Sequence, residues 1–125
     1  MPPLILVMLG GAIGAGFRYH ISTVALRFMG PGFPWGTWII NLLGGFLMGV
    51  LAGVLARSNE GAEQLRLFLG VGVLGGFTTF SAFSLETFNM LQRGDPVMAA
   101  SYAVSSVAGS VLMLIGGVYM VRALA

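Results

Sequence analysis

Cysteine and lysine are absent from this chain of 125 residues, and acidic residues number only four. Without cysteine, neither a disulfide framework nor a thiolate metal site can form. The six basic residues are all arginines that stand one at a time, so the pI of about 9.7 reflects no basic patch for nucleic acid. Charged residues make up only 8% of the chain, which leaves too little polar surface to cover a soluble globule.

The chain is instead rich in apolar residues, at 57%, and its mean hydropathy is +0.93. Four stretches reach the ~20 residues that cross a bilayer, at about 4–27, 36–56, 65–91 and 97–122. The connections are short, so consecutive helices should be antiparallel neighbours in a single domain over residues 1–125. The first stretch has no basic n-region and continues into Arg18, so we expect it to be retained rather than cleaved as a signal peptide. The sequence therefore predicts an all-α membrane protein with four transmembrane helices.

Glycines recur at four-residue spacing, for example at Gly45, Gly49 and Gly53, which lets helix backbones approach closely in lipid. A four-helix bundle of this size has little room for both a packed core and an aqueous path, so we expect a homo-oligomer. The arginines divide three against three between the two membrane sides, with Arg57, Arg66 and Arg122 opposite Arg18, Arg27 and Arg93. Because the positive-inside rule then gives no preference, we infer insertion in both orientations and an antiparallel dimer.

Residues suited to catalysis or metal binding are scarce, since the chain has one histidine and no cysteine. No serine–histidine–acid set or cluster of metal ligands is indicated, and we expect no enzyme. The glycine pattern at 70–75 matches the dinucleotide fingerprint, but that motif has meaning only between a strand and a helix. Inside a membrane-length apolar stretch, it indicates helix packing instead.

The third stretch is interrupted near 75–79, where Gly75 and Gly76 are followed by two threonines of low helix propensity. Backbone groups freed at membrane depth must face protein or water rather than lipid, which makes this segment the first candidate for a functional site. Beyond it, Phe80, Phe83 and Ser84 lie along one helix face. The rings are either ordinary packing residues or present their positive edges to an anion beside hydroxyl donors.

Polar residues in the other stretches allow similar alternatives. The Asn41 amide needs a partner in hydrocarbon, either as glue between helices or in a polar pathway, and the residue alone leaves both open. Arg18 and Glu86 either pair with each other or lie in a water-filled vestibule. The last stretch contains three hydroxyl residues spaced four apart, Tyr102, Ser106 and Ser110. Such hydroxyls can bond back to carbonyls of their own helix, but three on one face favour a polar track.

Over nearly its whole length the sequence resembles the Fluc/CrcB family of fluoride channels. The resemblance is carried by residues 10–19 in the first helix, 36–44 in the second and 75–84 in the third, and Gly109-Ser110 in the fourth agrees too. It implies a dual-topology antiparallel homodimer with two pathways, in the inner (plasma) membrane, for passive export of cytoplasmic fluoride. The candidate pathway residues are Arg18, Asn41, Thr79, Phe80, Phe83, Ser84, Tyr102, Ser106 and Ser110.

The resemblance also implies a structural sodium ion at the dimer centre, held by the backbone carbonyls of Gly75 and Thr78. A broken helix frees carbonyl oxygens, and hard cations take oxygen ligands. Two other functions remain as alternatives. A proton-coupled exporter of the small multidrug-resistance type would need an acid in the first helix, but no acid precedes Glu60. A non-transporting assembly subunit would need no aligned asparagine, phenylalanine and hydroxyl faces.

Overall fold

In a computed structural model, which describes residues 2–57 and 62–124, the chain forms four membrane-length helical spans. The first two are α1 (Pro3–Met29) and α2 (Trp35–Leu55), and the last is α6 (Pro96–Leu124). The third span, Ala62–Gln92, is divided into α3 (Ala62–Leu65), a π-helix η1 (Arg66–Leu74), α4 (Gly75–Phe77) and α5 (Ser81–Gln92). The all-α prediction is confirmed, since no strand occurs in the described ranges. Predicted and observed ends of the spans differ by one to three residues.

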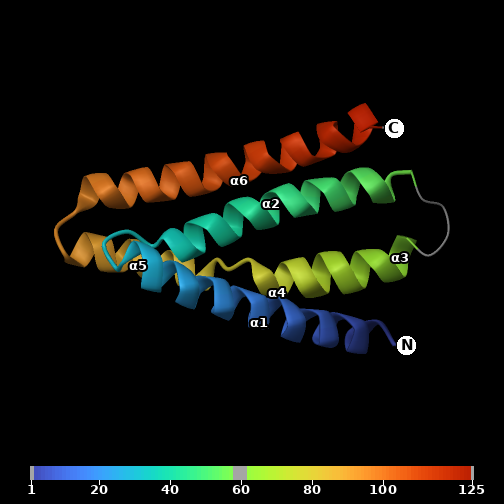
Figure 1. The fold of residues 1–125 in the computed structure, drawn as a ribbon, viewed down its shortest axis with the longest axis horizontal. Helices are drawn as coiled ribbons and strands as arrows, with labels where there is room; N and C mark the ends of the chain where they lie inside the picture. The colour runs from blue at the N-terminus through green and yellow to red at the C-terminus, as the bar shows by residue number, and fades with distance from the viewer. Residues whose placement is uncertain (1, 58–61, 125) are drawn as a thin grey trace.

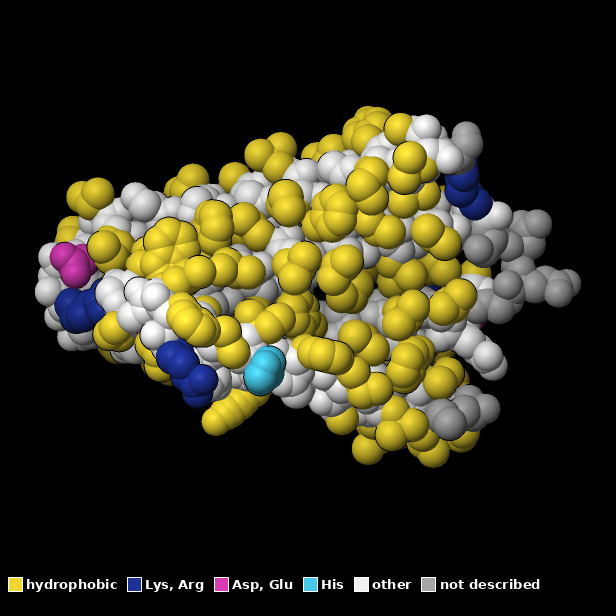
Figure 2. All heavy atoms as spheres, viewed as in Figure 1, with side chains coloured by type: hydrophobic (Ala, Val, Ile, Leu, Met, Phe, Trp, Pro, Cys, Tyr) yellow, Lys and Arg dark blue, Asp and Glu magenta, His cyan; other side chains and the backbone are white. Residues whose placement is uncertain are grey.

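The four spans run side by side, and both chain ends lie at the same end of the bundle (Figure 1). α6 packs mainly against α2, and α1 packs mainly against η1 and α4. Hydrophobic side chains cover most of the face shown in Figure 2, with charged side chains mainly toward the two ends. At 1.5 Å per residue, even the 21 residues of α2 reach the ~30 Å of a bilayer core. The molecule is therefore a multi-pass membrane protein.

Glycines occur where the helix backbones meet. A β-carbon added at Gly10 would lie 2.9 Å from the Cα of Gly72 in η1, and one added at Gly49 would meet the Leu114 carbonyl of α6. These contacts confirm that the glycine faces serve close packing, because any larger side chain there would separate the helices.

The third span is interrupted at Thr78–Phe80, near its middle. This position falls at the C-terminal end of the predicted segment, since Gly75 and Gly76 remain helical. Gly76 serves packing instead, because a β-carbon there would lie 2.5 Å from the Gly11 carbonyl oxygen of α1. The π-helix before the break was not predicted, because nothing in the local composition distinguishes its wider turns from α-helix.

Candidate functional site

The break is held open by one side chain from another helix. The Asn41 Oδ1 of α2 accepts a hydrogen bond from the Thr79 amide at 2.9 Å, and the Asn41 Nδ2 donates to the Thr79 carbonyl at 3.0 Å. Asn41 thus replaces the helical partners of both backbone groups. The Thr79 Oγ1 in turn accepts a hydrogen bond from the Ala82 amide at 3.1 Å and so satisfies one of the free amides in the first turn of α5.

Two carbonyls before the break are affected by this arrangement. In a continuous helix the Thr79 amide would donate to the Gly75 carbonyl, so its bond to Asn41 removes that carbonyl's helical partner. The Gly76 carbonyl accepts a hydrogen bond from the Nε of Arg18, in α1, at 3.2 Å. Arg18 therefore bonds to the backbone at the break rather than to Glu86. Of the two predicted alternatives, pairing of Arg18 with Glu86 is not observed.

A groove of about 390 Å³ adjoins the break, between α2, α5 and α6. It collects most of the predicted pathway residues, although they come from three separate spans. Its predicted members are Asn41, Thr78, Thr79, Phe80, Phe83, Ser106 and Ser110, and apolar residues such as Met48, Leu74 and Val111 complete the lining.

Ser106 is the most informative of these residues. Its side chain is 4% exposed, and its Oγ has no hydrogen-bond partner in the part of the chain that the structure describes. For the hydroxyls of α6, the alternative to a polar track was a hydrogen bond to a carbonyl of their own helix. Ser106 does not form such a bond. A buried hydroxyl without a partner is unfavourable by about 1–3 kcal/mol, so the groove offers an unused donor to a polar occupant.

Two aromatic rings form one wall of the groove. Phe80 is 76% exposed, and its ring centroid lies 5.5 Å from that of Phe83. Phe83 continues inward to Tyr102, at 5.2 Å between centroids. Because aromatic ring edges carry partial positive charge, such a wall can face an anion without a fixed cation that would hold it tightly.

Tyr102 is fully buried and contacts residues that line the groove and residues that line a second cavity. Its hydroxyl donates to the Glu86 Oε1 at 3.1 Å and also hydrogen-bonds the Thr37 side chain. Glu86 and Thr37 both line a cavity of about 290 Å³ at the end of the bundle where α1 ends and α2 begins. Sequence reasoning placed neither residue in the site, although Thr37 lies one helical turn before Asn41.

Four predicted residues lie outside the groove lining. Tyr102 is fully buried and packs against Phe83. Ser84 is exposed, Gly75 is exposed on the helix before the break, and Arg18 contacts the break from α1. The roles assigned to all of the candidate residues remain predictions, and the structure reports only where they lie.

The sequence of this chain is similar to one family model and to several named proteins. A family model described as CrcB-like protein, Camphor Resistance (CrcB), matches residues 5–118. A protein of Novosphingobium aromaticivorans named "Fluoride-specific ion channel FluC" is 56% identical over 121 residues, which cover 95% of each chain. A protein of the same name from Phenylobacterium zucineum is 53% identical over 98% of this chain and 97% of its own length. Another, from Sphingopyxis alaskensis, is 49% identical over 99% of this chain and 98% of its own length. The chain therefore belongs to the CrcB-like protein family.

Proposed function

We propose that this chain is the subunit of a fluoride-specific ion channel in the inner (plasma) membrane, which lets cytoplasmic fluoride leave passively. The observation that carries the proposal is the buried, unpaired Ser106 hydroxyl in a groove that also holds the Phe80 and Phe83 rings. Relatives at 49–56% identity are named for this activity, and their names describe a channel rather than an enzyme.

The side chains around the groove suit a small, strongly hydrated anion. The anion loses part of its hydration shell when it enters the groove, and hydrogen-bond donors must replace the lost water. The Ser106 and Ser110 hydroxyls supply such donors along one face of α6. The Asn41 amide is already engaged with Thr79, so its main role here is to hold the break that exposes the rings. Tyr102 then leads the pathway to Glu86 and Thr37 in the second cavity.

The function is tested by anion efflux from liposomes that contain the purified protein. We expect rapid fluoride release, exclusion of chloride, and no requirement for a proton gradient. The Phe83→Ile variant should release fluoride more slowly while remaining a dimer, because isoleucine keeps apolar volume but has no ring edge. Equal efflux of chloride and fluoride through the unmodified protein would refute the selective-channel proposal.

We further propose that two chains assemble as an antiparallel dimer around a structural sodium ion. The exposed Phe80 ring and the one-sided groove indicate that a second copy completes the pathway. The Gly75 carbonyl lacks its helical partner, and Gly75 itself is exposed, as a ligand shared between two copies would be. Together with the Thr78 carbonyl it would give the oxygen ligands that sodium prefers.

This assembly predicts two results, one for the protein in the membrane and one for the purified protein. Reporters fused to the C-terminus should be found on both sides of the membrane, and replacing sodium by a large organic cation should weaken the dimer in detergent. A single orientation would contradict the antiparallel arrangement, whereas a dimer unaffected by sodium would remove the ion from the proposal.

A proton-coupled exporter of the small multidrug-resistance type is less consistent with the structure. Such a protein needs a membrane-embedded acid in its first helix, and α1 contains no acidic residue. The efflux assay separates the two functions, because an exporter of that type depends on the proton gradient.

A further inference from the structure

The connection between α1 and α2 places an aromatic side chain against Tyr102. Phe33 lies in this connection, half-buried, between Pro31 and Pro34. Its ring meets the Tyr102 ring edge-on, with 5.3 Å between centroids and 89° between planes. Phe33 also lines the second cavity, so it contacts both that cavity and Tyr102, which packs against Phe83 of the groove.

Tyr102 is held by three different elements. Phe33 contacts its ring from the connection, Phe83 contacts it from α5, and the hydroxyl bonds Glu86 of α5 and Thr37 of α2. Only the connection among these is not part of a membrane-spanning helix. Removal of the Phe33 ring would therefore free one side of the tyrosine ring, so that the tyrosine is no longer fixed in a single position.

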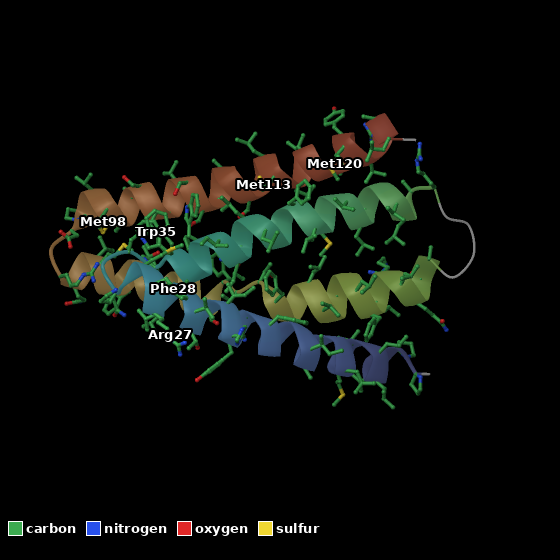
Figure 3. The ribbon with its side chains drawn as sticks, viewed as in Figure 1. Arg27, Phe28, Trp35, Met98, Met113 and Met120 are labelled. Carbon is green, nitrogen blue, oxygen red and sulfur yellow. The ribbon has the colours of Figure 1, made fainter. Side chains whose placement is uncertain are left out.

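The position of Phe33 is itself supported by its neighbours. The Trp35 ring lies 4.7 Å from it, and Trp35 meets Trp38 at 5.9 Å. The Trp38 Nε1 donates to the Ser105 Oγ of α6 at 3.0 Å, and the Ser105 Oγ donates to the Tyr102 carbonyl at 3.3 Å. Figure 3 shows Arg27 and Phe28 of α1 at the same end of the bundle as Trp35. A continuous row of aromatic rings thus runs from this end of the bundle to the break; its members are Trp35, Phe33, Tyr102, Phe83 and Phe80.

We propose that Phe33 is a positioning residue for permeation: it holds the Tyr102 ring so that the tyrosine stays between Phe83 of the groove and Glu86 and Thr37 of the second cavity. The inference rests on the proposed fluoride channel function and adds the α1–α2 connection to it. A change in the conformation of the connection would reach Tyr102 through this ring contact.

The test is fluoride and chloride efflux from liposomes with wild type, Phe33→Ala, Phe33→Leu and Phe33→Trp. If an edge-on ring pair keeps Tyr102 in place, losing it should lower fluoride efflux by about fivefold in the alanine and leucine variants. We also expect chloride efflux to rise in both, because Tyr102 is then no longer fixed between residues of the two cavities. Tryptophan restores a ring and should restore both fluxes.

Two comparisons separate positioning from mere structural support. In a Tyr102→Phe background, which already lacks the hydroxyl, Phe33→Ala should cause little further change, since both substitutions act on the same group. Phe28→Ala, which removes an exposed ring nearby, should conduct like wild type. Wild-type flux and chloride exclusion in the alanine and leucine variants, or effects that simply add to those of Tyr102→Phe, would overturn the inference. Failure of wild type itself to conduct fluoride would instead refute the proposed function.

Discussion

Replacing Asn41 by leucine should abolish most fluoride efflux, by about 100-fold. Leucine has nearly the same shape as asparagine but leaves the Thr79 amide and carbonyl unpaired at the break. Each unpaired buried group costs about 1–3 kcal/mol, so the broken conformation loses about 2–4 kcal/mol relative to alternatives, and 1.4 kcal/mol corresponds to tenfold. The measurement is the rate of fluoride release from liposomes at equal protein density.

The matched control is Gln92→Leu, which makes the same kind of polar-to-apolar change at an exposed position at the end of α5. It should conduct like wild type. If Asn41→Leu conducted as well as this control, the amide would have no role in holding the pathway open.

Replacing Gly49 by valine should prevent stable folding or dimer formation. The β-carbon position of Gly49 lies against the Leu114 carbonyl and Cα of α6, so a side chain there must push backbone away from backbone. Overpacking of a rigid contact costs about 1–3 kcal/mol or more, which is a large part of the stability of a small domain. We expect a clear fall in melting temperature in detergent and loss of the dimer peak on size exclusion.

Gly116→Val gives the control for this prediction. Gly116 is also a helical glycine of the α2–α6 pair, but nothing lies within 4 Å of its β-carbon position. The same added volume should therefore leave the melting temperature nearly unchanged. A similar loss in both variants would show that helix propensity, rather than the close approach of α2 and α6, explains the effect.

Local periodicity was sufficient for much of the candidate site. Ser106 and Ser110 line one groove because residues four apart share a helix face, and that spacing is visible in the sequence. The glycines at helix contacts could be predicted for the same reason, since small residues at four-residue spacing have meaning before any partner helix is known.

Other predictions from composition were less accurate. The third span was expected to break near 75–79; the break lies at Thr78–Phe80, so it includes the two threonines, but Gly75 and Gly76 remain helical. Propensity is a weak local preference, whereas the position of the break depends on two hydrogen bonds from Asn41, 38 residues away in the chain.

By itself, then, the sequence determined the membrane class, the four spans, and the faces that carry glycines, rings and hydroxyls, because all of these follow from composition and helical periodicity. Only the tertiary structure decided which backbone groups Asn41 and Arg18 bind, that Tyr102 contacts residues of both cavities, and that Phe33 packs against it. These contacts join residues far apart in the chain, and their geometry depends on how closely the helices pack, which no local pattern specifies.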